Sequence, residues 1–281
     1  MWIIVYTGLA ILSASFYQIV QKTLTNTYRG VEISQISLLV SALVYTGFIL
    51  YQGLSFEQYT QSTFILTLLS GILIGGGNFA LAKGLELSDI SVVSPVQQTI
   101  PIFAGILEPI ILTQFEYEST KLIAAVIVVI GAFIITGSAN TTQNGFIPNS
   151  IDKRGILFGL LSALLYGTSS IISHSVTQTV GIWHYLIVQV TIGFFVITIA
   201  RKLQLPAFDK QLLEYGLLYS ISLALQVHVI SILSASLATI LFRVSLVINV
   251  LAGYIVFKEQ NIKLRLIGSL FILIGIYISI M

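Results

Sequence analysis

Two ionisable residues, Glu108 and Arg243, lie inside hydrophobic segments that are long enough to cross a bilayer. A charged side chain at the centre of a membrane helix costs roughly 2.5–3.5 kcal/mol on insertion scales, so such residues normally face a bundle interior or a wet cavity. A guanidinium there could hold a carboxylate or a phosphate. A carboxylate could counter that charge or bind a proton. The pair therefore indicates a polar pathway through a membrane protein.

The composition of the chain is that of a membrane protein. Apolar residues make up 56% of the 281 residues, charged residues make up only 9%, and the mean hydropathy is +0.97. A soluble domain carries about 25% charged residues, so lipid has to be the solvent for most of this surface. The net charge is only +2 and no basic run is present, which argues against a nucleic-acid partner. There is no cysteine, which excludes disulfides and thiolate metal sites.

Ten segments of the chain are apolar enough to cross the membrane. A helix that spans about 30 Å of hydrocarbon needs about 20 apolar residues. The first segment lacks a basic leader and a cleavage site, so we expect it to be a retained span. We therefore predict an all-α, polytopic membrane protein with ten transmembrane helices, at residues 2–21, 32–52, 63–82, 90–112, 119–137, 155–175, 183–200, 212–230, 233–256 and 263–280.

The longest polar stretch falls at the middle of the chain and separates two sets of five segments. A shift of 145 residues places Gln98 on Arg243, and Ser94 on Thr239. An odd number of spans in each half inverts the second copy, and inverted repeats place a substrate site near the midplane, where the halves meet. We predict two inverted five-helix repeats, 1–139 and 155–281, joined by a loop at 140–154. A chance likeness between apolar helix pairs is the alternative.

Polar residues follow one face of the fourth and ninth segments. In the fourth segment the steps are four, three, four and three residues, which fit one side of a helix. In lipid such a face turns inward, so the two segments should line a shared cavity. If the segments are antiparallel, Glu108 and Arg243 differ in depth by roughly 7–8 Å. We therefore expect that their side chains can meet, either as a structural ion pair or as part of a substrate site. The face residues are Ser94, Gln98, Pro101, Gly105 and Glu108, and Ser236, Thr239, Arg243, Asn249 and Gly253.

Other polar residues and three prolines extend this candidate site. Each interior amide is by itself more often a satisfied core group, but together they indicate a wet interior. Proline removes a backbone donor, and three in one segment favour a broken helix that lines a cavity. The candidate substrate-binding residues are Arg243, Glu108, Gln98, Asn78, Gln97, Asn249 and Gln226, and the candidate hinge residues are Pro95, Pro101 and Pro109. No metal, nucleotide or nucleophile motif occurs in the sequence, so we expect no metal site, no cofactor and no enzyme activity.

Short motifs along the chain carry a family resemblance. Residues 85–91 (LELSDIS), followed by Pro101, resemble the junction of helices three and four in the EamA-type branch of the drug/metabolite transporter superfamily. Residues 164–167 (LLYG) resemble its helix six, and residues 257–259 (FKE), followed by Gly268 and Gly275, resemble its last two helices. The resemblance covers nearly the whole chain. It implies a multi-pass transporter of the cell inner (plasma) membrane that exports amino acids, related metabolites or drugs.

These observations predict a secondary active transporter. We expect it to export a small metabolite, such as an amino acid, a related polar or anionic compound or a drug, through a central cavity by alternating access. Its partners would be the small-molecule substrate and the bilayer. Proton coupling and the oligomeric state stay open. The alternative is a flippase or carrier for a phosphorylated lipid or a nucleotide-sugar type of substrate. A membrane enzyme would need catalytic groups clustered at one interface, and the sequence shows none.

The orientation of the chain in the membrane receives two conflicting predictions. Eleven lysines and arginines lie near the loops that follow odd-numbered spans, and only Lys121 lies on the opposite side. The positive-inside rule then places both termini outside the cytoplasm. The family resemblance implies that both termini lie inside.

Overall fold

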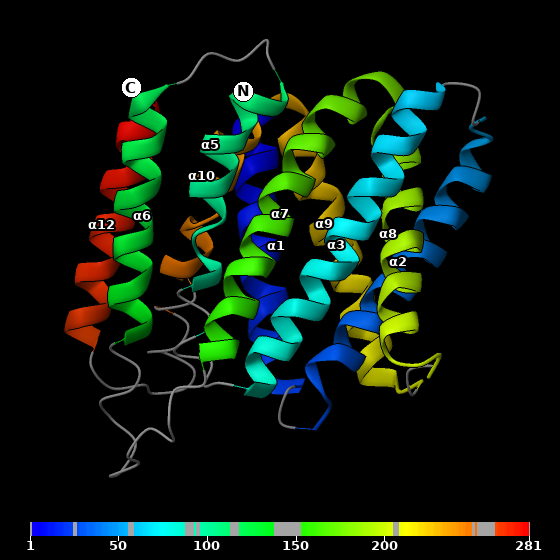
Figure 1. Cartoon of the computed structure of the whole chain (residues 1–281), viewed down its shortest axis with the longest axis horizontal. Helices are drawn as coiled ribbons and strands as arrows, with labels where there is room; N and C mark the ends of the chain where they lie inside the picture. Colours follow the sequence, from blue (N-terminus) through cyan, green and yellow to red (C-terminus); the bar gives the residue numbers. More distant parts are fainter. Residues whose placement is uncertain are drawn as a thin grey trace.

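The computed structural model describes residues 2–24, 27–55, 59–87, 93, 96–112, 118–137, 153–204, 208–248, 251 and 262–280. In these residues the regular secondary structure is helical throughout (Figure 1). The helices are α1 (Trp2–Leu24), α2 (Gly30–Gln52), α3 (Gln61–Leu87), α5 (Ile100–Ile111), α6 (Ser119–Gly137), α7 (Lys153–Val180), α8 (Ile182–Ala200), α9 (Lys210–Ile232), α10 (Ala235–Leu241) and α12 (Ile262–Ile280).

The described helices confirm a polytopic α-helical membrane protein. Six of them, α1, α2, α3, α7, α8 and α9, are long and apolar enough to span a bilayer. Four shorter apolar stretches occupy the remaining predicted spans, at Ile100–Ile111, Ser119–Ile134, Ala235–Ile248 and Leu266–Ser279. Successive helices run in alternating directions, and both termini lie at the top of the view in Figure 1. The helix α7 begins at Lys153, two residues before the predicted start of the sixth span.

Many polar side chains are buried and many large apolar side chains are exposed, as expected when lipid surrounds the protein. Gln35, Gln189 and Ser220 are at most 1% exposed, whereas Leu50 and Ile199 on the outer surface are 74% and 66% exposed. Apolar side chains can face hydrocarbon without penalty, but an amide or hydroxyl there needs a hydrogen-bond partner within the protein. Polar side chains are therefore gathered between the helices, where they can bond to one another.

The helices form an inner group and a lateral pair. α3 packs against α7 and α8, and α9 packs against α1 and α2. α5 lies between α7 and α10, and α6 and α12 pack chiefly against each other at one end of the bundle (Figure 1). Segments that are far apart in sequence thus face each other, so the two predicted repeats share one interior.

A cluster of hydroxyl groups joins α3, α7 and α8 in that interior. The Tyr185 hydroxyl lies 2.5 Å from the Oγ atoms of both Ser70 and Ser173. The Gln189 amide donates to the same Tyr185 hydroxyl at 2.8 Å and to Ser70 and Ser169 at 3.0 and 3.1 Å. Such a network fixes one register of the three helices, because sliding any of them would leave buried polar groups unpaired.

A second polar cluster, which we call the α2–α8 clasp, joins Glu32 and Gln35 of α2 to the end of α8. Arg201 donates to Glu32 at 3.0 Å and also to the side-chain oxygen of Gln35. The Gln35 amide donates in turn to the Thr198 hydroxyl at 2.8 Å and to the Gln204 carbonyl at 2.9 Å. The clasp therefore connects the first predicted repeat to the turn between α8 and α9.

That turn contains two successive residues in the left-handed region, Lys202 with φ 56° and Leu203 with φ 64°. A side chain with a Cβ atom is disfavoured there by roughly 1–2 kcal/mol per residue. Such a backbone persists only where its surroundings hold it. Here the Lys202 amide donates to the Ile199 carbonyl at 2.9 Å and the Leu203 amide donates to the Thr198 carbonyl at 2.8 Å. The α2–α8 clasp adds the contact from Gln35 to the Gln204 carbonyl directly after the turn.

Close backbone contact between α6 and α12 depends on glycine. A Cβ atom on Gly131 would lie 2.5 Å from the Gly268 carbonyl oxygen and 2.9 Å from Ile272. A Cβ atom on Gly275 would lie 2.8 Å from the Ala124 carbonyl oxygen. Small residues at such crossings let membrane helices approach closely enough to pack well.

We predict that Gly131→Ala lowers the stability of the α6–α12 pair by about 1–3 kcal/mol, the usual cost of forcing extra atoms into a packed interface. Thermal unfolding in detergent measures this. The matched control is Gly47→Ala in α2, where an added Cβ atom meets no atom within 4 Å. Equal melting temperatures for the two variants would show that the α6–α12 contact is looser than described.

Candidate functional site

The fourth and ninth predicted spans are broken helices. After α10 the backbone turns at Phe242 and Arg243, where the Arg243 amide bonds to the carbonyl three residues earlier, and then continues helically to Ile248. Before α5 the same kind of turn occurs at Gln98 and Thr99. Gln98 and Arg243 are the pair that the 145-residue shift superimposes, so the breaks lie at equivalent places in the two predicted repeats.

The two breaks are joined by a hydrogen bond. Arg243 Nη1 donates to the side-chain oxygen of Gln98, and Arg243 Nε donates to the Thr239 carbonyl oxygen at 3.1 Å. Gln98 is buried, while Arg243 keeps partial exposure. Two of the predicted site residues thus meet where α5 and α10 face each other.

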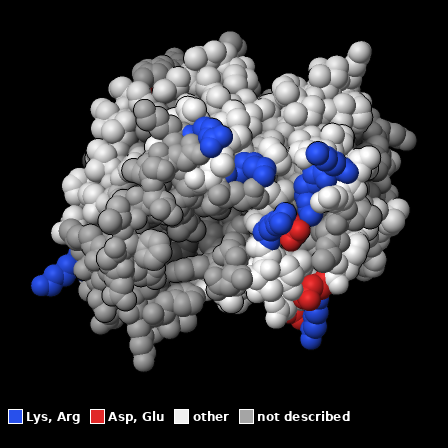
Figure 2. Space-filling model, turned by 60° about the horizontal axis from the view of Figure 1, so that its bottom comes forward, with Lys and Arg blue, Asp and Glu red and all other residues white. Residues whose placement is uncertain are grey.

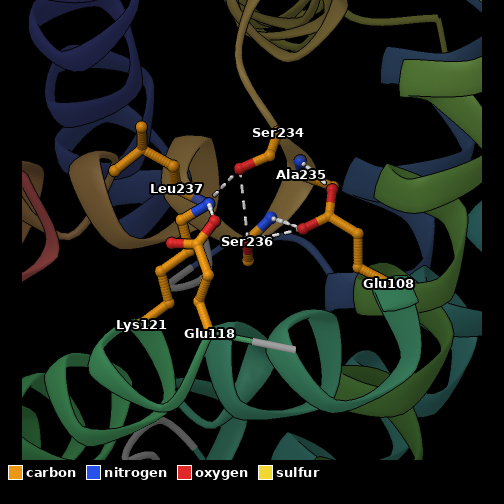
Figure 3. A network of polar contacts seen from close by, with 7 residues as sticks. All are labelled: Glu108, Glu118, Lys121, Ser234, Ala235, Ser236 and Leu237. Carbon is orange, nitrogen blue, oxygen red and sulfur yellow. Dashed lines mark hydrogen bonds and ion pairs between the residues drawn. The ribbon is translucent and has the colours of Figure 1, made fainter. Parts of the chain in front are cut away.

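Glu108 has a different partner, the N-terminus of α10 (Figure 3). Its Oε1 accepts from the Ala235 amide at 2.5 Å, and its Oε2 accepts from the Ser236 amide at 3.1 Å and from the Ser236 hydroxyl at 2.5 Å. The Ser234 hydroxyl accepts from the Leu237 amide at 3.4 Å. The first three amides of α10 are therefore satisfied, and the carboxylate also complements the positive end of the helix dipole.

The predicted contact between Glu108 and Arg243 is wrong. No ion pair joins them within the described residues, because each side chain is engaged elsewhere. The reason is the place where α10 starts. A turn at Leu233 and Ser234 brings free amides to the depth of Glu108, whereas Arg243 lies eight residues further on, roughly 12 Å along the helix axis.

Four tyrosines form a cluster beside Arg243. Tyr17 of α1 packs edge-on against Tyr219 of α9 at 5.7 Å and against Tyr215 at 6.4 Å between ring centroids. Tyr166 of α7 lies within electrostatic range of Tyr17 and Tyr219, and Tyr17 lies within range of Arg243. None of these tyrosines is among the residues predicted from the sequence. The one available signal was the spacing of Tyr215 and Tyr219, which are one helical turn apart.

The remaining predicted residues take varied positions. Asn78 donates to the Ile74 carbonyl oxygen at 2.9 Å and lies near the Tyr219 hydroxyl, so it borders the tyrosine cluster. Gln226 donates to Ser222 within α9 at 2.9 Å. Gln97 is half-buried beside the first break.

Of the three prolines, Pro101 lies in the first turn of α5, where its missing N–H needs no partner, and Pro109 lies near the end of that helix. Pro95, like Asn249, lies outside the described residues. The described prolines therefore start and finish α5, and the turn before the helix falls at Gln98 and Thr99.

We predict that Glu108→Ala destabilises the protein, because each orphaned buried amide costs about 1–3 kcal/mol. Hydrogen exchange at Ala235 and Ser236 should rise, and the melting temperature should fall. Glu108→Gln keeps one acceptor and should lose less stability. A Glu108→Gln protein of normal stability that has lost pH-dependent transport would instead assign Glu108 a proton-binding role.

Comparison with known proteins assigns this chain to a protein family. A family model described as the EamA-like transporter family matches residues 1–137 and again residues 153–281. No curated protein matches the chain. A solved structure titled "Crystal structure of protein" has a TM-score of 0.77 and 13% identity, covering 98% of this chain and 95% of that chain, and supports the fold. Since the family match covers nearly the whole chain in two copies, the protein belongs to the EamA-like transporter family and is a membrane transporter of the drug/metabolite type.

Proposed function

We propose that this protein is a secondary active transporter for a small metabolite with an anionic group, and that Arg243 binds that group. The observation that carries the proposal is a guanidinium deep in the bundle without a carboxylate partner among the described residues. The described ion pairs use Glu32, Glu118 and Glu214, and Glu108 is occupied by α10.

An uncompensated cation inside a membrane protein is costly, and an anionic ligand offsets that cost. Arg243 also keeps partial exposure, so a solute can reach it. Both properties fit a binding residue better than a structural one, because a structural cation is normally buried together with its counter-charge.

The tyrosine cluster indicates which kind of substrate body would fit beside Arg243. Tyr17, Tyr166 and Tyr219 are each partly exposed, and each offers an aromatic face with a hydroxyl at its end. Such walls suit a substrate with an apolar or aromatic body and a few polar groups. A carboxylate on Arg243 with its body against these rings is the substrate class that the site supports best.

Alternating access then follows from the proposed two-repeat organisation, 1–139 and 155–281 with the connection at 140–154. The site lies where segments of both repeats meet, and both contribute a broken helix, as in other transporters built from inverted repeats. Export is the direction that the family resemblance implies. The three hydrogen bonds that Glu108 accepts from the start of α10 favour the role of a helix cap for this residue.

We predict that Arg243→Ala lowers transport in proteoliposomes by about 10–100-fold, as expected for the loss of hydrogen bonds to a charged group. A thermal-shift screen of metabolites on the purified protein selects the substrate, because a bound ligand stabilises the folded state. Arg243→Lys keeps the charge but loses the planar fork, so it should restore only part of the activity.

The matched control for this experiment is Arg154→Ala at the exposed start of α7. Undiminished flux in a folded Arg243→Ala protein would remove Arg243 from the site. Stabilisation by phosphorylated lipids, without any response to water-soluble anions, would favour the flippase function instead.

The distribution of charge supports an orientation for the transporter. Figure 2 shows lysine and arginine side chains gathered on the face opposite to the termini. We propose that this face is cytoplasmic. Because the chain has no cysteine, single cysteines report on sidedness without background.

We predict that an impermeant maleimide applied to intact cells labels Thr120→Cys, at the end of the bundle that carries the termini. It should not label Lys210→Cys, at the opposite end. Both positions are exposed. Labelling of Lys210→Cys alone would place both termini inside, as the family resemblance implies.

A further inference from the structure

We propose that Gln98 is a placeholder ligand for Arg243. Its amide oxygen takes the position that an oxygen of the substrate's anionic group takes during transport, and the substrate displaces it. This proposal rests on the proposed function and adds a selectivity for planar oxyanions and a link between binding and movement.

The orientation of the guanidinium is fixed before any ligand arrives. Arg243 Nε donates to the Thr239 carbonyl oxygen at 3.1 Å, which holds the plane of the group against its own helix. Nη1 donates to Gln98, and Nη2 donates to no acceptor among the described residues. The Nη1–Nη2 edge of the guanidinium is therefore fixed in orientation, and its one acceptor among the described residues is the neutral side-chain oxygen of Gln98.

A carboxylate can replace that acceptor with a gain in interaction. It presents two oxygens to the two Nη donors, and charge-assisted hydrogen bonds are roughly twice as strong as neutral ones. Gln98 presents one oxygen, and its –NH2 group cannot accept a hydrogen bond. An uncharged ligand gains little from the exchange, because it replaces one neutral hydrogen bond by another. Gln98 thus keeps Arg243 paired in the empty site and disfavours neutral ligands.

The placeholder also connects the two predicted repeats. Among the described residues, two polar contacts join these broken helices in addition to the packing of α5 against α10. They are the Glu108 cap at the start of α10 and the bond from Arg243 to Gln98 at the breaks. The substrate competes for the second contact only. Binding therefore removes the polar contact at the breaks while the cap still joins the helices at the other end, which makes the cap the pivot of the proposed movement.

Two substitutions test this arrangement. Gln98→Glu places a carboxylate on Arg243 permanently, and Gln98→Leu removes the acceptor while retaining most of the side-chain volume. The probe is benzoate, with benzyl alcohol as the neutral control, and the measurement is the thermal shift of the purified protein.

We expect benzoate to stabilise the wild-type protein, and the Gln98→Leu protein at a concentration about 3–10-fold lower, because one neutral hydrogen bond no longer competes. Gln98→Glu should melt at a higher temperature than wild type without ligand and should show no benzoate shift. Benzyl alcohol should shift none of them. Adding Arg243→Gln should abolish both the gain from Gln98→Glu and every benzoate shift.

Three results would overturn the placeholder. The first is a thermal shift with benzoate in the Gln98→Glu protein as large as in wild type. The second is weaker benzoate binding to the Gln98→Leu protein than to wild type. The third is the absence of a benzoate shift in both wild type and Gln98→Leu. If Arg243→Ala abolishes transport while Gln98→Glu transports normally, the placeholder fails and the proposed function stands. If folded Arg243→Ala transports normally, the proposed function fails as well.

Discussion

A peptide group without a hydrogen-bond partner destabilises a protein inside the hydrocarbon core of the membrane. This constraint accounts for most of what is unusual in the fold. Each unsatisfied N–H or C=O in the bilayer core costs several kcal/mol, so a helix that begins or breaks inside the bundle needs a substitute partner. α10 begins inside the bundle, and the side chains of Glu108 and Ser234 supply the hydrogen-bond acceptors for its first amides. The break at Arg243 brings a guanidinium onto the Thr239 carbonyl. A polar side chain accompanies each interruption.

This constraint gives the two intramembrane charges separate tasks. Because Glu108 is committed to the backbone of α10, it cannot neutralise Arg243. The guanidinium lies near the tyrosine cluster, and its side-chain partner is the neutral amide of Gln98. Glu108 stabilises the start of α10, and in the proposed function Arg243 stays available to a solute. A direct ion pair would occupy Arg243 in the empty protein and would compete with the proposed substrate.

Hydropathy and helical spacing predicted the membrane helices and the inward polar faces, and the 145-residue shift pairs Gln98 with Arg243, the two positions at which the helices break. Those features depend on local composition, which a sequence displays directly. The partner of Glu108 could not be predicted, because the depths of Glu108 and Arg243 in the membrane were calculated for a ninth span that is one continuous helix. The amides that capture Glu108 exist only because the chain turns at Leu233 and Ser234. The tyrosines were missed because hydropathy treats a ring in a span as an apolar residue, whether or not its hydroxyl faces a binding site.

The α2–α8 clasp has a consequence for biogenesis. Besides its own backbone hydrogen bonds, the left-handed turn at Lys202 and Leu203 is flanked by contacts from Glu32 and Gln35, which leave the ribosome long before that turn. The N-terminal helices are thus inserted in time to act as a template for the later ones. A C-terminal fragment made alone would keep the backbone hydrogen bonds of the turn but would lack the α2–α8 clasp beside it, so the order of synthesis is itself part of how this bundle reaches its shape.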